Sequence, residues 1–214
     1  MKTIILNGSP KGDKGNSEIF AKQFIKYMKH PLSIKYISKE NPKQLAVYVK
    51  DYDSIIIILP LYVHAMPGIV MKFIECLEPA IADNKSIGFL IQAGFPEAAQ
   101  EQYVERYFRV LAKELNYSYV GTVVRGAAAG TSMIPEFMSR KLFKLLNRLG
   151  IIYEKTNTFD KSISAKLAGP YKLKKSQLIF YEFLNKSGIN NLGWHKFLRK
   201  NNALDKRLDR PFLT

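Results

Sequence analysis

The segment from Ser54 to Leu59 contains four consecutive isoleucines and is followed by Pro60. An apolar run rich in β-branched residues, without polar alternation, is typical of a strand covered on both faces, as at the centre of a parallel sheet. Four further segments have strand patterns, and three of them also run into turn residues. Together these segments predict five strands: Thr3–Leu6, Leu32–Ile37, Ser54–Leu59, Ser86–Ile91 and Ser118–Val124.

Apolar residues at helical spacing lie between and after these strands. The stripes fall in residues 19–28, 45–49, 69–77, 103–115 and 142–149, and the second is the shortest. Strands that alternate with helices indicate a doubly wound α/β sheet with right-handed crossovers. Five strands within about 150 residues predict a flavodoxin-like, five-stranded parallel sheet of order 2-1-3-4-5.

We therefore expect a flavodoxin-like domain over residues 1–150 and a basic, helical C-terminal extension over residues 151–214. The extension has apolar stretches at 178–184 and at Trp194, Phe197 and Leu198, which we expect to form helices that pack on the core or on a partner chain. Of the formal net charge of +15, residues 1–138 carry +3 (16 Lys/Arg against 13 Asp/Glu), and residues 139–214 carry +12 (17 against 5). Clustered cations attract phosphates, nucleic acid or anionic lipid, and a solvated basic surface is the alternative.

Composition excludes several classes of protein. The hydrophobic content of 47% is that of a globular chain. No apolar run reaches the roughly 18 residues that cross a bilayer, and the apolar stretch at the N-terminus is too short for a signal peptide, so we expect a cytoplasmic protein. Cys76 is the one cysteine. It can form neither an intrachain disulfide nor a thiolate cluster, and we predict no metal site.

The loop after the first strand, from Asn7 to Ser17, has the composition of an anion site. Its glycines let backbone N–H groups turn inward, Ser9, Asn16 and Ser17 add side-chain donors, and Lys11 adds positive charge. Asn16 or Ser17 would also serve as N-cap of the following helix, whose N-terminus attracts anions. The glycine-lysine run of the P-loop and the Gly-x-Gly-x-x-Gly dinucleotide motif are both missing. A bound phosphate or a plain capped loop remain as interpretations.

Three other loops leave the same edge of the predicted sheet, where doubly wound proteins bind ligands. Residues 60–68 are apolar, aromatic and proline-rich, which favours contact with a flat apolar ring over a solvent-facing role. His64 in this loop either contacts a ligand or is an ordinary surface histidine. The small residues 126–132 either make room for a ligand or partner or form a flexible loop.

The two motifs Gly8-Ser9-Pro10…Asn16-Ser17 and Pro60-Leu61-Tyr62-x-x-x-Met66-Pro67-x-x-x-x-Lys72-x-x-x-Glu75 together resemble the NADPH-dependent FMN reductase family. The resemblance covers roughly residues 1–150 and implies FMN as cofactor, NAD(P)H as co-substrate and a homodimer. It implies that the FMN phosphate binds at Ser9, Lys11, Asn16 and Ser17. The ring would lie against Pro60, Leu61, Tyr62 and Val63 on one side and Ala93 and Gly94 on the other. Relatives often have a hydroxyl residue where Gln92 stands.

The leading hypothesis is an FMN-dependent NAD(P)H oxidoreductase that reduces a quinone, a flavin, a nitro or azo compound or a similar small acceptor. The flavin carries the chemistry, so no catalytic side chain is predicted. A flavodoxin-type electron carrier without NAD(P)H turnover is one alternative, although such carriers tend to be acidic. A binder of nucleic acid or of an anionic surface, acting through the basic extension, is the other.

Overall fold

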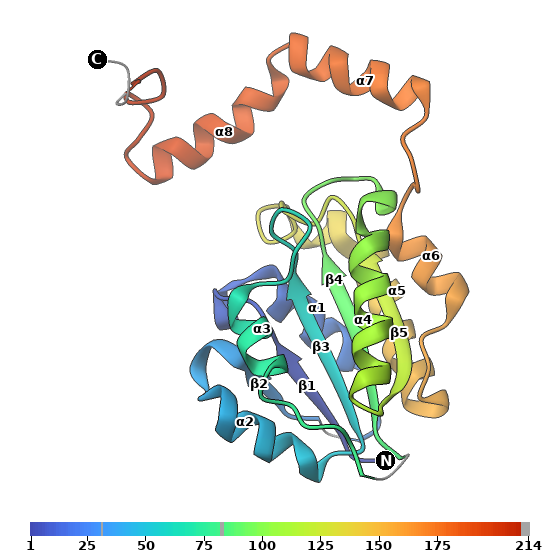
Figure 1. The fold of residues 1–214 in the computed structure, drawn as a ribbon. Helices are drawn as coiled ribbons and strands as arrows, with labels where there is room; N and C mark the ends of the chain where they lie inside the picture. Colours follow the sequence, from blue (N-terminus) through green and yellow to red (C-terminus); the bar gives the residue numbers. More distant parts are fainter. Residues whose placement is uncertain (31, 82–83, 211–214) are drawn as a thin grey trace. The chain divides into compact units, whose positions relative to one another are not determined.

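The computed structural model describes residues 1–30, 32–81 and 84–210. Its centre is a parallel sheet in which the strands follow the order β2-β1-β3-β4-β5 (Figure 1). The predicted flavodoxin-like topology is therefore confirmed. The strands are β1 (Thr3–Asn7), β2 (Ile34–Tyr36), β3 (Ser54–Pro60), β4 (Ser86–Gln92) and β5 (Ser118–Arg125).

The isoleucine run of β3 explains how the sheet is covered. Ile55 and Ile57 belong to one apolar cluster and Ile56 and Ile58 to another, because successive side chains of a strand point to opposite faces. The first cluster includes residues of α2 (Pro42–Tyr48), α3 (Gly68–Ile74) and α4 (Gln102–Glu114). The second includes residues of α1 (Asn16–Ile25), α5 (Glu136–Thr156) and α6 (Lys161–Ala168). Helices therefore cover both faces (Figure 1).

The helices α1 and α5 cross closely on the second face. A Cβ built at Gly150 in α5 would overlap the carbonyl oxygen of Phe24 in α1 and lie 2.9 Å from its carbonyl carbon. Phe24 is fully buried, and so is Tyr153 one turn after Gly150 in α5. The hydroxyl of Tyr153 donates to Ser54 Oγ at 2.7 Å. The missing side chain at Gly150 thus lets α5 approach both α1 and the sheet.

The first compact unit runs from Met1 to Lys172, and a second begins at Leu173. The boundary expected at residue 150 falls inside α5, which continues to Thr156. Beyond it, α6 buries Ile163 and Leu167 in the second apolar cluster, so the sheet domain needs these residues. The second unit contains α7 (Lys175–Lys186) and α8 (Ile189–Lys200), where the sequence predicted two helices.

No helix in the described part of the chain combines the length and the apolar character that crossing a membrane requires.

Candidate functional site

A buried polar network shapes the loop after β1. Asn7, fully buried at the end of the strand, donates from Nδ2 to the Gly12 carbonyl (3.2 Å) and to Glu18 Oε2 (3.1 Å), while its Oδ1 accepts the Ser9 N–H (3.0 Å). Glu18, also buried, accepts the Tyr36 hydroxyl at 3.0 Å. These buried hydrogen bonds thus fix the conformation of the loop. Sequence reasoning did not single out Asn7 or Glu18, although a polar residue ending an apolar strand was a usable signal.

Ser9 and Lys11 lie where an anion could approach the start of α1. Ser9 is buried, and its Oγ accepts the Lys11 N–H at 3.2 Å. A Cβ at Gly15 would lie only 2.7 Å from Ser9 Oγ, so the loop closes tightly because this residue is glycine. The N-cap of α1 is Gly15 rather than Asn16 or Ser17, and no side chain caps the helix. The first N–H groups of an uncapped helix form a ready anion site.

The side chain of Asn16 joins α1 to the loop after β5. Its Nδ2 donates to the carbonyls of Ala128 (2.8 Å) and Ala129 (3.2 Å), and its Oδ1 accepts the Ser132 N–H (3.1 Å). Both amide protons are therefore engaged within the protein. The residue predicted as a phosphate ligand thus holds the loop after β5 against the start of α1.

The loops after β4 and β5 are also bonded to each other. Ala93 N–H donates to the Arg125 carbonyl and Ala128 N–H to the Ala93 carbonyl, both at 2.9 Å. A Cβ at Gly126 would lie 2.7 Å from the Pro96 carbonyl oxygen, which explains the glycine. Gly94 is exposed, and no atom lies within 4 Å of the position of its absent Cβ. These loops are tightly joined at their base and leave open space at Gly94.

The loop after β3 makes a tight turn at the same edge. Tyr62 and Ala65 exchange backbone hydrogen bonds of 2.9 and 3.1 Å around Val63 and His64. These two residues have φ of 50° and 64°, a conformation that a β-branched residue such as Val63 rarely adopts. The side chain of Val63 is 92% exposed. The turn thus presents an apolar side chain to solvent at a strained position.

An aromatic stack joins this turn to the loop after β4. The rings of His64 and Phe95 are parallel to within 8°, with centroids 5.6 Å apart. Tyr62 and Phe95 are each about half exposed. Of the side chains predicted to contact a ring, Tyr62 and Val63 are therefore at the surface of this edge, whereas Leu61 is buried.

A buried glutamate and a partly buried arginine lie near these loops. Glu101 is only 2% exposed, and its Oε2 has no hydrogen-bond partner among the described residues. Burial raises the pKa of its carboxyl, and the nearby His64 partly lowers it. Burial also lowers the pKa of Arg125, whose Nη1 donates to the Leu167 carbonyl at 3.3 Å. Sequence reasoning missed both residues, because nothing in the local pattern shows that they are withdrawn from solvent.

The structure brings the ten predicted site residues to one edge of the sheet, at the carboxyl ends of β1, β3 and β4 (Figure 1). Ser17 is held beneath this edge, where its Oγ accepts Gln92 Nε2 at 3.3 Å. Leu61 is buried and donates its N–H to the Gln92 carbonyl at 2.8 Å. This edge of the sheet therefore has a polar end at Ser9 and Lys11 and an apolar end at Tyr62, Val63 and Gly94.

Several solved structures share this fold. An NADPH-quinone reductase from P. pentosaceus superposes with a TM-score of 0.54 and 16% identity, over 69% of this chain and 96% of its own. General stress protein 14 from Treponema denticola, solved in complex with FMN, gives 0.55 and 13%, over 72% and 98%. An apo NADH:FMN oxidoreductase gives 0.54 and 12%, over 83% and 99%. No protein-family model matches the chain, and no curated protein matches it.

Proposed function

We propose that the protein is an FMN-dependent NAD(P)H oxidoreductase that reduces a small acceptor such as a quinone, a flavin or a nitro or azo compound. The observation that carries this proposal is the uncapped start of α1 inside a loop pre-shaped by Asn7 and Glu18. The fold neighbours support it, because one was solved with FMN and two are named for reactions with NADPH or NADH. Ligand binding at this edge is the general rule for doubly wound sheets.

The residues present fit FMN at both ends. A terminal phosphate would meet the Ser9 hydroxyl, the first N–H groups of α1 and the Lys11 ammonium. A flat ring would lie at the apolar end of this edge, where Gly94 leaves space for close approach to the backbone. The absence of both other phosphate-loop motifs disfavours a nucleoside triphosphate or a dinucleotide as the resident ligand.

In this assignment the side chains bind and position. Ser9, Lys11 and Ser17 form the phosphate end, and Asn16 keeps the loop after β5 in place. Pro60, Leu61, Tyr62, Val63, Ala93 and Gly94 form the walls for the ring. FMN, when bound, would supply the redox chemistry by taking hydride from the nicotinamide and passing electrons to the acceptor.

The direct test is whether the purified protein is yellow, releases FMN on denaturation and rebinds it with one-to-one stoichiometry. We expect Ser9→Ala to weaken FMN binding by roughly 10- to 100-fold, because hydrogen bonds to charged groups contribute about 1.5–3 kcal/mol. Ser33→Ala is the matched control, since Ser33 is exposed and precedes β2 at the opposite edge. Steady-state oxidation of NADPH and NADH with menadione then tests turnover.

Two results would contradict the proposal. Colourless protein that cannot be reconstituted with FMN would show that FMN is not the cofactor. FMN-loaded protein that fails to oxidise either nicotinamide would leave an electron carrier as the better description.

A further inference from the structure

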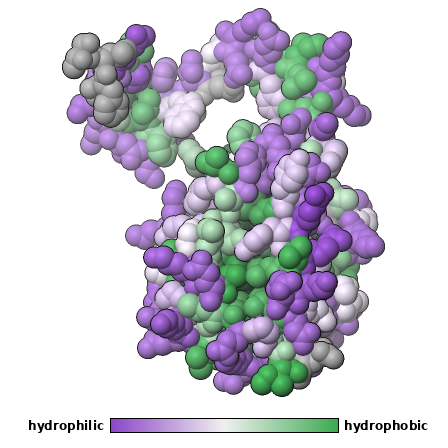
Figure 2. All heavy atoms as spheres, viewed as in Figure 1, coloured by the Kyte–Doolittle hydropathy of each residue, from purple (hydrophilic) through white to green (hydrophobic). Residues whose placement is uncertain are grey.

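The second compact unit, which begins at Leu173, has an excess of positive charge and exposed apolar side chains. It contains nine Lys/Arg against three Asp/Glu. Among its exposed residues are Ile179, Phe180, Phe183, Trp194 and Phe197. Figure 2 shows apolar side chains gathered among hydrophilic ones within this unit. A surface with both properties requires a partner that is both anionic and apolar.

The helix α8 separates the two properties by side. At 100° per residue, Trp194, Phe197 and Leu198 fall on one side of the helix. The opposite side carries the other four residues of its last two turns: His195, Lys196, Arg199 and Lys200. Trp194 is 63% exposed. A helix with aromatic and aliphatic residues on one side and cations on the other is typical of segments that lie in a membrane interface.

The helix α7 also exposes apolar side chains, with cations at its two ends. Ile179, Phe180 and Phe183 share one side and are each more than half exposed. Lys175 and Lys186, the first and last residues of the helix, flank this side on its Ile179 border. None of the residues of α7 is buried, so the helix gains little stability from packing within the unit. Its apolar side is therefore available to a partner.

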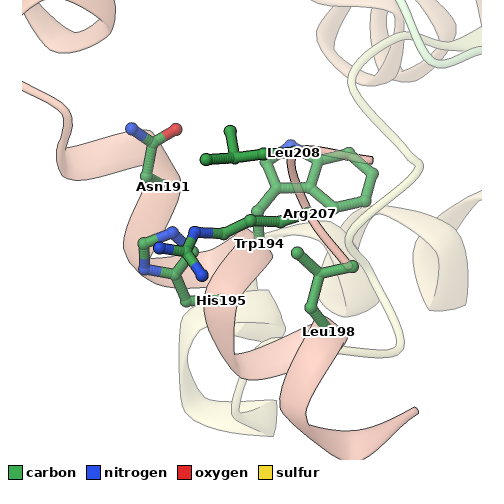
Figure 3. A pocket seen from close by; sticks show the side chains of 6 residues that line it. All are labelled: Asn191, Trp194, His195, Leu198, Arg207 and Leu208. Atoms are coloured by element: carbon green, nitrogen blue, oxygen red, sulfur yellow. The ribbon is translucent and has the colours of Figure 1, made fainter. Parts of the chain in front are cut away.

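A pocket beside α8 combines the same chemistry at a smaller scale. It has a volume of about 330 Å³ and is lined by residues of α8 together with Arg207 and Leu208. Figure 3 shows the polar ends of Asn191, His195 and Arg207 toward one side of it and the apolar side chains of Trp194, Leu198 and Leu208 toward the other. Arg207 also donates from Nη1 to the Leu204 carbonyl at 3.1 Å, which holds the side chain in place. A phosphodiester attached to a hydrocarbon chain matches both sides.

We propose that this unit docks on an anionic phospholipid surface, with the apolar sides of α7 and α8 at the acyl boundary and a headgroup phosphate between His195 and Arg207. Self-association through this surface is disfavoured, because two copies would bring like charges together. Single-stranded nucleic acid would stack on aromatic rings beside cations. In α8 an aliphatic side chain shares the aromatic side and the cations lie opposite, which is the arrangement for an interface between water and lipid.

The test uses the full-length protein and vesicles of phosphatidylcholine with and without roughly one-third phosphatidylglycerol. We expect flotation with the anionic vesicles only and release by salt. Trp194 is the one tryptophan in the sequence, so its emission reports directly on α8. Its maximum should move to shorter wavelength as the indole enters the interface. Neither readout depends on FMN or on turnover.

Two variants test the cations and the apolar side of the unit. Lys196→Gln with Lys200→Gln should weaken binding by about 25-fold, because each cation near an anionic surface contributes roughly a factor of five. The control pair is Lys113→Gln with Lys144→Gln, which are exposed lysines of α4 and α5.

Phe183→Glu should weaken vesicle binding at least as much as the lysine pair. Val110→Glu is its control, because Val110 is an exposed apolar residue of α4. Both Phe183 and Val110 are more than half exposed, so neither change should impair folding.

Three outcomes would overturn the proposal. Equal binding to zwitterionic and anionic vesicles would show that the cations do not drive binding. Loss of binding in the controls to the same extent as in the variants would place the surface elsewhere. Tighter binding to an oligonucleotide than to anionic vesicles, without a shift of the Trp194 emission on vesicles, would assign the unit to nucleic acid.

Discussion

The close crossing of α1 and α5 predicts that Gly150→Ala destabilises the sheet domain. The new methyl group would overlap the Phe24 carbonyl, which is backbone and cannot rotate away. The two helices must then separate by roughly an ångström or more to regain ordinary contact. Such a shift loosens the buried layer between them, where Leu146, Leu149 and Tyr153 of α5 are fully buried.

Two opposing terms set the size of the effect. Overpacking a close-packed interior typically costs about 1–3 kcal/mol, and the upper end applies because the obstacle is backbone. Alanine gains about 1 kcal/mol over glycine in a helix interior. We therefore expect the free energy of unfolding to fall by about 2 kcal/mol, which lowers Tm by roughly 4–8 °C for a domain of this size.

Urea unfolding followed by far-UV circular dichroism measures this change. Gly68→Ala is the control, because Gly68 opens α3 and no atom lies within 4 Å of the position of its absent Cβ. The control should be neutral or slightly stabilising. If Gly150→Ala unfolded at the same urea concentration as Gly68→Ala, the close approach of α1 and α5 would be refuted.

Three further changes test the interior and the candidate site. Burial raises the pKa of Glu101, so the folded state holds this proton more tightly than the unfolded state, and stability falls as pH rises through the raised pKa. In urea unfolding, Glu101→Gln should therefore be more stable than the wild type at pH 8 but not at pH 4. Tyr153→Phe removes the buried bond to Ser54 Oγ and should cost about 1–2 kcal/mol in the same assay. Asn16→Ala releases the loop after β5, so limited proteolysis near residue 130 should accelerate and FMN binding should weaken.

The strands were largely predictable from sequence because their signal is local. The isoleucine run was expected at Ser54–Leu59 and lies at Ser54–Pro60. The edge strand β2 is shorter than the expected 32–37, since it pairs with one neighbour only. The helix α6 was not predicted. It is eight residues long and buries only Ile163 and Leu167, so its main sequence signal was Asp160, whose Oδ1 caps it by accepting the Ile163 N–H at 2.8 Å.

The candidate site was predictable in position but not in detail. Loops that leave the carboxyl ends of parallel strands must share an edge, and glycine, serine and proline mark them in the sequence. The bonds that shape the site join residues far apart in the chain, such as Asn16 with Ala128 and Ser17 with Gln92. Local pattern showed that Asn16 carries donors. Only the folded chain shows that both of its amide protons are engaged.

Backbone strain in the described residues is concentrated where the function is proposed. Six residues other than glycine have positive φ, and three of them are asparagines, which tolerate this conformation. The other three, Val63, His64 and Ala127, all lie in the loops after β3 and β5. Such conformations cost of order 1 kcal/mol or more each and persist only when surrounding structure enforces them. Here the surrounding structure is the set of hydrogen bonds among the loops. We infer that these three residues serve the shape of the loops rather than the stability of the domain.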